Sequence, residues 1–157
     1  MFISTKLYKE IGPVAYRQWR ADSDCKYLHG YALSFYFEFE AVDLDARNWV
    51  VDFGGLKPLK DKLEEWFDHT TLVATDDPEF ETFVELRNKK MIKMVEVERT
   101  GCEGLADFVY NYMNEIFMPE QGYGDRVWCR KVVVSETEKN SAGYEGSRCV
   151  KGYVHGT

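Results

Sequence analysis

The sequence predicts an α+β domain in which an antiparallel sheet is backed by two amphipathic helices. Apolar and polar residues alternate from Leu33 to Ala41, which is typical of a strand with one buried face. Two later segments repeat their apolar residues every three or four positions, as helices with one buried side do. The elements follow in the order strand, strand, helix, strand, helix, strand, which favours this fold class.

A single domain, residues 1–157, accounts for the whole sequence. Its length suits one domain with its own core, and 45% hydrophobic with 30% charged residues is the composition of a folded protein. No internal repeat, low-complexity tract or linker divides the sequence.

The predicted strands combine apolar runs or alternation with β-branched and aromatic residues. The first is an extended N-terminal segment interrupted at Gly12 and Pro13, and a later apolar run at Trp49 is very short. In chain order, the strand candidates are 2–9 with 13–20, 33–41, 91–98 and 127–135.

The first helix is expected between Leu56 and Phe67. Leu56, Leu59, Leu63 and Phe67 recur at helical spacing, with lysine and glutamate on the other side. Pro58 is compatible with this helix only in its first turn, where a missing N–H costs no hydrogen bond.

The second helix begins at a capping-box sequence, in which Thr100 and Glu103 would satisfy free backbone N–H groups. Apolar residues then recur over 105–117, and a proline and a glycine follow. The highly charged segment 70–90 predicts a loop that holds a short helix near Phe80–Leu86, and residues 139–157 predict a polar C-terminal tail.

Charge and hydropathy exclude two classes of partner. The formal charge is −7 and the pI is near 5.0, which argues against a protein that grips nucleic-acid phosphates but is compatible with a small anionic substrate held by a few local cations. No apolar run approaches the roughly 20 residues that span a bilayer, so no membrane partner is expected. The N-terminus lacks the pattern of a secretory signal, and a cytoplasmic protein is expected.

Cysteines and histidines are few and scattered. The cysteines form no C-x-x-C pair, so free thiols are expected. Any site built on histidine must draw on three residues. The four cysteines are Cys25, Cys102, Cys129 and Cys149, and the three histidines are His29, His69 and His155.

Three short segments carry residues that are suited to chemistry. Cys25 and His29 lie four positions apart, so a thiolate could form near an imidazole, although such a pair is more often unrelated. Asp68 could orient His69 as a general base, against the simpler reading of a solvated acid and a helix-end histidine. Glu136 follows a run of valines, where a carboxylate can accept two parallel hydrogen bonds from a heterocycle but is more often a surface residue.

Taken together, the order and spacing of these segments resemble one family. The sequence is similar to the 6-pyruvoyltetrahydropterin synthase and 6-carboxytetrahydropterin synthase family from about residue 12 to residue 144. The motifs that carry the resemblance are C-x-x-L-H-G at 25–30, V-D-F-x-x-L-K at 51–57, F-D-H-x-x-L at 67–72, E-x-L-A at 103–106 and V-x-x-E-T at 133–137.

The resemblance implies the tunnelling fold, a four-stranded antiparallel sheet with two helices on one face. Subunits of this fold close an oligomeric barrel, commonly a homohexamer of two trimers. It also implies a lyase of the 6-carboxytetrahydropterin synthase type that acts on 7,8-dihydroneopterin triphosphate in the biosynthesis of 7-deazaguanines, the queuosine precursors. The alternatives are a 6-pyruvoyltetrahydropterin synthase, a non-catalytic pterin- or purine-binding paralogue without zinc, and a protein that uses the barrel only as a scaffold.

The resemblance also assigns roles to single residues. Cys25 aligns with the proton-abstracting cysteine of the family. Asp68 and His69 align with the pair that assists proton transfer and triphosphate elimination. Glu136 aligns with the carboxylate that anchors the pterin ring, and Glu103 with the acid of a P-T-x-E segment, in which this chain has Gly101 in place of threonine.

The expected zinc site departs from the family pattern. Family members supply three histidines, whereas this chain has Tyr16 and Tyr31 at two of the aligned positions and only His29 at the third. One imidazole and two phenols with pKa values near ~10 are a poor set compared with the usual three-ligand catalytic zinc sites. The sequence therefore predicts an incomplete zinc site.

Overall fold

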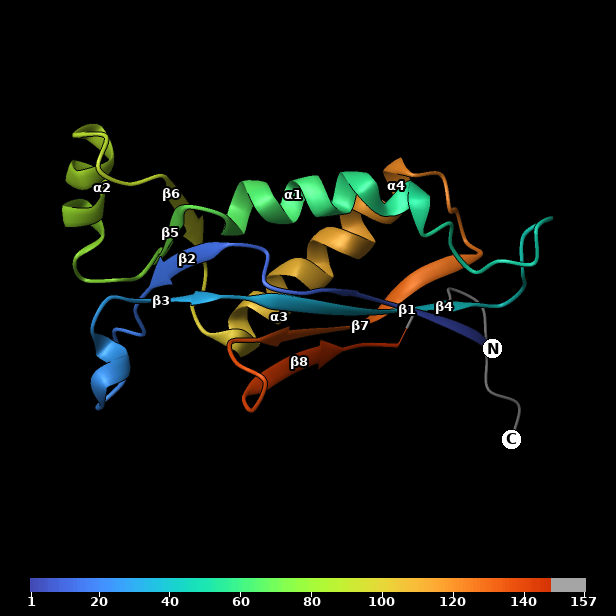
Figure 1. Cartoon of the computed structure of the whole chain (residues 1–157), viewed down its shortest axis with the longest axis horizontal. Coiled ribbons are helices and arrows are strands. Elements are labelled where there is room, and N and C mark those ends of the chain that lie inside the picture. Colours follow the sequence, from blue (N-terminus) through green and yellow to red (C-terminus); the bar gives the residue numbers. More distant parts are fainter. Residues whose placement is uncertain (148–157) are drawn as a thin grey trace.

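The computed structural model describes residues 1–147, and its larger sheet has four antiparallel strands in the order β1-β4-β7-β8 (Figure 1). β4 is central and pairs with β1 on one side and β7 on the other. Its alternation is as predicted, since Phe35, Phe37 and Phe39 are completely buried. The strands are β1 (Phe2–Tyr8), β4 (Ser34–Ala41), β7 (Val127–Ser135) and β8 (Ser141–Glu145).

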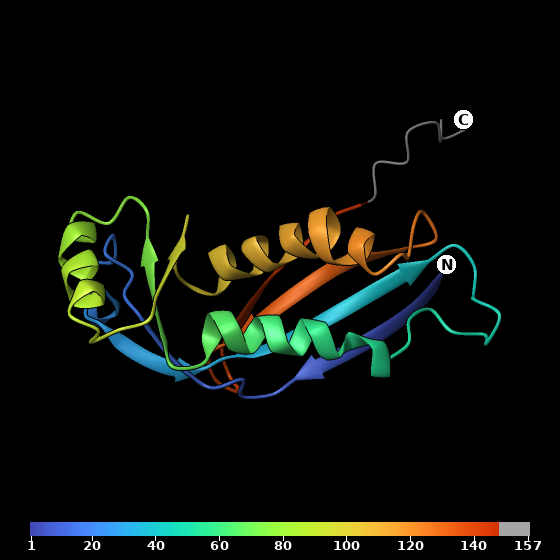
Figure 2. The same ribbon diagram turned by 90° about the horizontal axis from the view of Figure 1, so that it is seen from above.

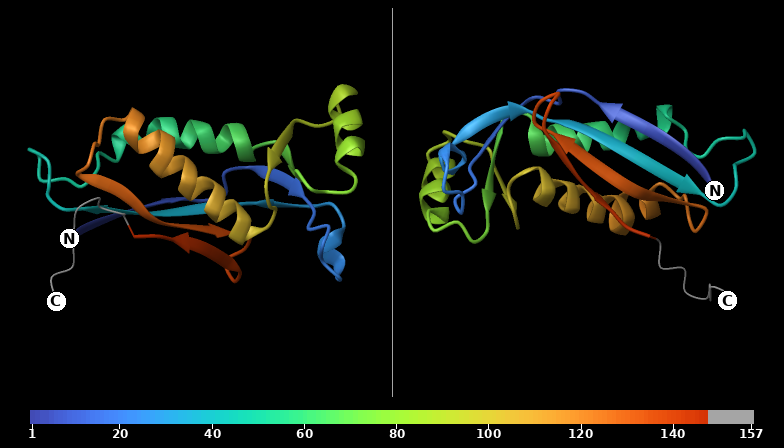
Figure 3. Two further views of the ribbon diagram at one scale, coloured as in Figure 1. Left: turned by 180° about the vertical axis from the view of Figure 1, so that it is seen from behind. Right: turned by 90° about the horizontal axis from the view of Figure 1, so that it is seen from below.

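Two long helices cover one face of this sheet. Figures 1 and 2 show α1 (Lys57–Phe67) and α3 (Cys102–Tyr112) lying on the same side of it, and the right panel of Figure 3 turns the opposite face to the viewer. A π-helical segment, η3 (Met113–Phe117), and α4 (Met118–Glu120) extend α3. This arrangement confirms the predicted α+β sheet with two helices on one face.

The core lies between the central strand and these helices. Leu59, Leu63 and Phe67 of α1 are completely buried, and the Phe67 ring packs against Phe35 with centroids 4.7 Å apart. Burial of each such side chain contributes about 1.5–3 kcal/mol. Pro58 stands in the first turn of α1, as expected.

A second, mixed sheet at one end of the molecule was not predicted. Its order is β3-β2-β5-β6, with β2 and β3 antiparallel and β5 parallel to both β2 and β6. Figures 1 and 2 show this sheet and α2 at the end of the long axis away from the N-terminus. The elements here are β2 (Pro13–Tyr16), β3 (His29–Ala32), β5 (Thr70–Ala74), β6 (Met94–Val97) and α2 (Phe80–Asn88), and two 3-10 helices are η1 (Asp24–Lys26) and η2 (Gly54–Leu56).

Segment 70–90 is the main correction to the sequence prediction. It contains the strand β5, of which every residue is buried, so the sequence lacks the alternation that marks a half-buried strand. The short helix expected there is present as α2. The strand expected at 91–98 is confined to Met94–Val97.

The expectation of a polar tail also needs correction. The short apolar run Trp49–Val51 forms a bend, in which Val50 and Val51 are buried. Residues 141–145 of the expected polar tail form β8, while residues 148–157, with Cys149 and His155, lie outside the described part.

The capping box at the start of α3 is absent. Gly101 is the N-cap residue, and no side chain caps the helix. The Thr100 hydroxyl instead donates to the backbone carbonyl of Arg17 at 2.7 Å, which ties α3 to the end of β2. The hydroxyl therefore donates to a distant carbonyl and does not accept from a backbone N–H of the helix.

The structure also bears on the thiols and on the helices as possible membrane spans. Cys25, Cys102 and Cys129 are free thiols. No helix within residues 1–147 has the length and apolar character needed to cross a bilayer.

A buried ion pair joins the ends of β2 and β5. The Arg17 Nε donates to Asp77 Oδ2 at 2.8 Å, and a second Arg17 N–H donates to Oδ1. The Asp77 side chain is 2% exposed and also accepts from the backbone N–H of Glu79. The hydrogen bonds from Arg17 lower the pKa of Asp77.

Replacement of Asp77 with alanine is expected to lower the free energy of unfolding by about 2–3 kcal/mol at pH 7. A buried pair costs about 3–5 kcal/mol when one partner is lost, and Arg17 is partly exposed. Because the folded pKa of Asp77 is lowered, the difference from wild type should be full above about pH 4 and shrink at lower pH. Urea unfolding measures both, with the exposed Asp76→Ala as control, for which a loss under about 1 kcal/mol is expected. An equal loss in both variants would contradict the role of the buried pair.

Candidate active site

Three aromatic side chains meet on one face of the β2–β3 pair. Tyr16 is paired with His29, and Val14 with Tyr31, so the alternation of a strand places Tyr16, His29 and Tyr31 on the same side. The ring centroids are 5.6 Å apart for Tyr16 and His29, 5.9 Å for the two tyrosines and 5.2 Å for His29 and Tyr31. The structure thus brings together the three positions expected to hold zinc, which we call the Tyr–His cluster.

One contact fixes the tautomer of His29. Its Nδ1 lies 2.6 Å from the backbone carbonyl oxygen of Tyr27. Because a carbonyl oxygen can only accept, Nδ1 carries the proton and donates it to Tyr27. In the neutral ring, Nε2 is then the atom with a free lone pair.

The two phenols of the cluster are held in their neutral form. Tyr16 is 0% exposed, and burial, followed by the nearby Cys102 and Glu136, raises its pKa far above the ordinary value. Burial, the charge of Glu136 and a hydrogen bond with its side chain also raise the pKa of Tyr31. Within residues 1–147 the buried Tyr16 hydroxyl has no hydrogen-bond partner, and such a group costs about 1–3 kcal/mol. A bound group that accepts a hydrogen bond would satisfy it.

Glu136 and Cys102 complete this side of the site. Glu136 directly follows β7, and its backbone N–H donates to the carbonyl of Asn140 at 3.1 Å, which fixes the turn that presents the carboxylate. Cys102 begins α3, and burial, with the charges of Glu136 and Glu103, raises the pKa of its thiol to about 11. Sequence reasoning did not single out Cys102, because a cysteine at a helix start gives no signal of the tertiary burial that keeps it protonated.

Cys25 is the accessible thiol of the three that the structure describes. It lies in η1, whose N-cap Ser23 accepts a hydrogen bond from the Cys25 backbone N–H at 3.4 Å. Its carbonyl oxygen accepts from the backbone N–H of Gln18 at 2.9 Å, and this bond holds η1 against the end of β2. Cys25 is half-buried and interacts electrostatically with both Tyr16 and Tyr31, so it borders the Tyr–His cluster.

Asp68 and His69 form a pair at the junction of α1 and β5. His69 Nδ1 lies 2.6 Å from Asp68 Oδ1, and the carboxylate leaves Nε2 of the ring as the reactive nitrogen. The backbone of His69 is left-handed, with φ of 57°, and its N–H donates to the carbonyl of Pro13 at 2.7 Å. The Asp68 side chain occupies the space where any side chain at Gly12 would lie. This turn presents an imidazole that is 78% exposed.

His69 and the Tyr–His cluster serve opposite faces of the second sheet. His69 lines a cavity of about 600 Å³ together with Ala15 and Gly30, a pair that points away from the cluster. Within one chain, the structure therefore does not bring Asp68 and His69 to Cys25.

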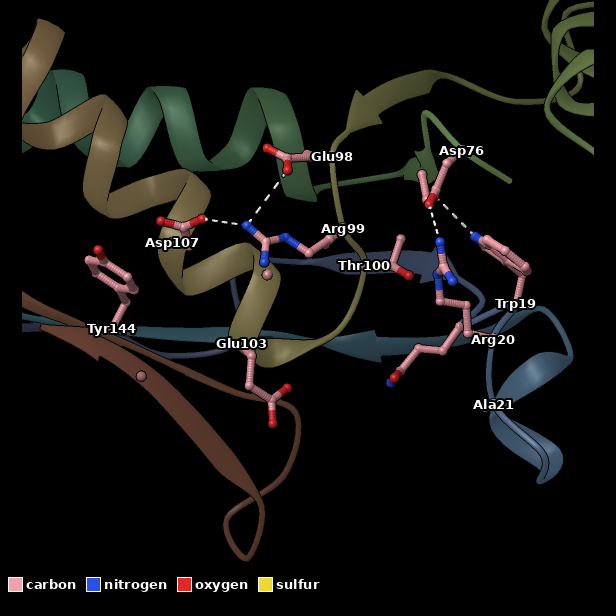
Figure 4. A pocket seen from close by; sticks show the side chains of 14 residues that line it. Trp19, Arg20, Ala21, Asp76, Glu98, Arg99, Thr100, Glu103, Asp107 and Tyr144 are labelled. Atoms are coloured by element: carbon pink, nitrogen blue, oxygen red, sulfur yellow. Dashed lines mark hydrogen bonds and ion pairs between the residues drawn. The ribbon is translucent and has the colours of Figure 1, made fainter. Parts of the chain in front are cut away.

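Glu103 lies in a third place, a cavity of about 600 Å³ between the start of α3, the segment after β2 and β8 (Figure 4). In that cavity Arg99 pairs with Asp107 at 3.1 Å, while Figure 4 shows the Glu103 carboxylate pointing away from this pair. Neither Cys25 nor Glu136 lines the cavity, so the structure does not unite Glu103 with the Tyr–His cluster.

Gly101 has a backbone reason to replace the threonine of the family pattern. Its φ is 95°, a backbone angle that residues other than glycine rarely adopt, and a Cβ at this position would lie 3.3 Å from the Gln18 side chain. The sharp turn into α3 therefore requires glycine.

Comparison with known proteins identifies the family. A family model described as 6-pyruvoyl tetrahydropterin synthase matches residues 13–147. No curated protein matches the sequence at a significant level.

Solved structures share the fold at low sequence identity. An uncharacterised protein of Wolinella succinogenes is 19% identical with a TM-score of 0.78, over 93% of this chain and 98% of that one. A catalytic-residue mutant of Plasmodium vivax 6-pyruvoyltetrahydropterin synthase is 15% identical with a TM-score of 0.63, over 94% and 100%. The Caenorhabditis elegans 6-pyruvoyl tetrahydropterin synthase is 19% identical with a TM-score of 0.58, over 94% and 98%. At these identities the likeness shows the fold alone.

The donor set of the Tyr–His cluster does not fit zinc. Family enzymes typically use this ion, and a catalytic zinc ion takes three protein ligands that must be unprotonated. Here His29 offers one imidazole nitrogen, while Tyr16 and Tyr31 have raised pKa values and remain neutral phenols. Within residues 1–147, no three His, Cys, Asp or Glu side chains are grouped so as to hold a metal ion.

Purified wild-type protein is therefore expected to contain well under one zinc per chain, and Tyr16→His with Tyr31→His should create a site that binds zinc tightly. The two new imidazoles would join His29 on the same strand face, and neither needs to lose a proton at neutral pH. Metal analysis after dialysis against a weak chelator measures both. Adding His29→Ala to the double variant is the control and should abolish the binding. One zinc per wild-type chain that is lost in His29→Ala would contradict this account.

Proposed function

We propose that this chain, which belongs to the 6-pyruvoyl tetrahydropterin synthase family, is a pterin-triphosphate lyase of the 6-carboxytetrahydropterin synthase type. Its substrate is 7,8-dihydroneopterin triphosphate, on the route to 7-deazaguanines. The observation that supports this most is the grouping of an accessible thiol, Cys25, with Glu136 and the unpartnered hydroxyl of Tyr16. A protein that kept only the fold would have no use for this grouping.

The elimination needs a base on one side of the substrate and an acid on the other. A base removes a proton from carbon, a carbon–carbon double bond forms, and the carbon–oxygen bond to triphosphate breaks with its electron pair. Cys25 as the thiolate is the proposed base. His69, oriented by Asp68, is the proposed acid that gives a proton to the leaving oxygen.

Glu136 is the proposed anchor of the pterin ring. A carboxylate can accept two parallel hydrogen bonds from a ring N–H and its neighbouring amino group. The negative charge of Glu136 acts on both Tyr31 and Tyr16, which supports a place for this carboxylate beside the Tyr–His cluster.

The neutral phenols of Tyr16 and Tyr31 take over stabilisation of the substrate oxygens in this proposal. A buried hydroxyl aimed at a developing negative charge stabilises it strongly, because the donor is already in place before the reaction. This substitution implies a slower enzyme than one with a metal ion, since a neutral donor lowers the pKa of a substrate hydroxyl less than a cation does.

The proposed enzyme works as a homo-oligomer, a hexamer by analogy with the family. Cys25 and His69 serve opposite faces of one chain, so a second copy must bring His69 to the Cys25 side. β1 and β8 each pair on one side only, which leaves both edges of the larger sheet open within the described residues. Phe2, Ile3 and Leu7 of β1 are exposed apolar residues of the kind that such a contact would cover.

The main alternative is a non-catalytic protein that binds a pterin or purine, and the donor set that does not fit zinc favours it. Incubation of purified protein with 7,8-dihydroneopterin triphosphate, with and without Zn²⁺, separates the two. Release of triphosphate and the mass of a 6-carboxy product support the lyase. Tight binding without triphosphate release supports the alternative, and a 6-pyruvoyl product supports the related synthase.

Cys25→Ala is expected to abolish triphosphate release, by at least about 100-fold, while pterin affinity stays within about twofold. The thiol is assigned to proton transfer rather than to ring recognition, and a general base contributes about 10²–10⁴ in rate. Phosphate-release kinetics and fluorescence titration with the pterin measure the two effects. Cys129→Ala is the control, because this thiol is buried far from the Tyr–His cluster in β7. Full activity of Cys25→Ala would remove the thiol from the mechanism.

Glu136→Gln is expected to weaken pterin binding about 10- to 100-fold. The amide keeps the size of the side chain but turns one acceptor into a donor that faces a ring donor, and charged hydrogen bonds contribute about 1.5–3 kcal/mol each. Titration with a pterin that lacks the triphosphate measures this without turnover. Glu138→Gln, on the exposed residue two positions later, is the matched control. Unchanged affinity would show that Glu136 does not touch the ring.

A further inference from the structure

The cavity beside His69 is lined by cations and by no carboxylate. It has a volume of about 600 Å³ and lies over one face of the second sheet, closed on one side by the chain that leaves α2. Arg87, Lys90 and Lys93 are its charged residues, and Thr71 of β5, which lies on the same strand face as Ala15, adds a hydroxyl group. The basic sequence R-N-K-K-M-I-K at 87–93 supplies all three cations, although the sequence alone does not distinguish this segment from an ordinary charged loop.

These three cations have no anionic partner in the part of the chain that the structure describes. The neighbouring arginines do: Arg17 pairs with Asp77, and Arg20 pairs with Asp76. Lys93 forms no ion pair, and Arg87 contacts only the amide oxygen of Asn88 at 3.5 Å. Because like charges around one hollow repel each other, this concentration of positive charge in a chain of net charge −7 favours an anion.

The helix dipole explains only part of this cluster. Positive side chains at the C-terminal end of α2 are favourable, and this accounts for Arg87 and Lys89. Lys93 lies well beyond the helix. Lys90 has φ of 60°, the left-handed conformation that follows many helices and is usually taken by glycine. A lysine at this position costs backbone energy relative to glycine.

We propose that this cavity binds the triphosphate group of the substrate, with Arg87, Lys90 and Lys93 contacting its oxygens beside His69. The inference rests on the proposed function and assigns the part of the substrate that leaves. A triphosphate carries several negative charges and many acceptor oxygens, and it matches the three cations and the Thr71 hydroxyl that line this cavity. His69 lines the same cavity, so its exposed ring lies where a leaving oxygen needs a proton.

A small polyphosphate fits this cavity better than a nucleic acid does. Nucleic-acid surfaces present a stripe of positive charge over a basic domain, whereas here three cations surround one hollow in an acidic chain. Asp68, the carboxylate nearest in sequence, does not line the cavity, because it lies behind the His69 ring against Gly12. A bound anion would therefore touch no carboxylate among the residues that line the cavity.

The test is calorimetric titration of the full chain with inorganic triphosphate, without substrate or divalent metal. Arg87→Ala and Lys93→Ala are each expected to weaken binding about tenfold, as the loss of one charge-assisted contact does. Lys90→Gly should do the same while relieving the left-handed backbone, so a loss of affinity cannot be ascribed to misfolding. Lys89→Ala is the matched control, since it removes the same charge one residue away without touching the cavity. It should stay within about twofold of wild type.

The outcomes separate this inference from the proposed lyase activity. Equal weakening by Lys89→Ala and Lys93→Ala, or no binding of triphosphate by the wild type at 150 mM salt, would overturn the cavity as a site. Tighter binding of a short single-stranded RNA with the same pattern of variants would also overturn it in favour of a nucleic-acid surface. Triphosphate binding with the expected pattern but no turnover would support the site and count against the lyase. If the enzyme turns over and Lys93→Ala keeps the wild-type KM, the lyase stands and the site fails.

Discussion

The turn at Asp68 and His69 is the constraint on which both halves of the candidate site depend. It ends α1 and starts β5, and the bond from the His69 N–H to the Pro13 carbonyl sets the register of β5 on β2. β2 in turn carries Tyr16 and holds β3, so the Tyr–His cluster inherits its position from this turn. The turn is possible only because Gly12 leaves room for Asp68. One tight contact between backbone and carboxylate thus places an acid–base pair on one face and an aromatic cluster on the other.

The fold could be predicted where local pattern and tertiary burial agree. β4 and α1 show this, because Phe35 and Phe67 lie at positions that their own periodicity marks as buried, and they then meet in the core. The second sheet could not be predicted, because β5 is buried along its whole length and β2, β3 and β6 have four residues each, too few to show a period. Thr100 failed as a cap for a related reason: its hydroxyl is positioned by the bond that it donates to a carbonyl 83 positions away in the sequence, and not by a local N–H.

The candidate site divides in the same way. The motifs around Cys25, His69 and Glu136 are visible as residue types, but nothing in the sequence shows that Ala15 and Gly30 separate the face of His69 from that of the Tyr–His cluster. Burial, which raises the pKa values of Tyr16 and Cys102, is likewise a property of the packed chain. Spacing along the chain identifies which groups are available, and only the paired strands decide which of them can act on the same molecule.

The unsatisfied hydroxyl of Tyr16 links the stability of the free protein to occupancy of its site. A buried donor that finds no acceptor within residues 1–147 lowers the stability of the fold by an amount comparable with a tenth or more of the stability of a typical domain. A ligand oxygen that accepts from Tyr16 would remove this cost, so part of its affinity would come from a hydrogen bond that residues 1–147 do not supply. Phenylalanine at this position is expected to raise the free energy of unfolding and to lower the affinity for the ligand. Such a trade-off between stability and function is common at functional sites. The Tyr16 hydroxyl would thus lower the stability of the fold and raise the affinity of the site for its ligand.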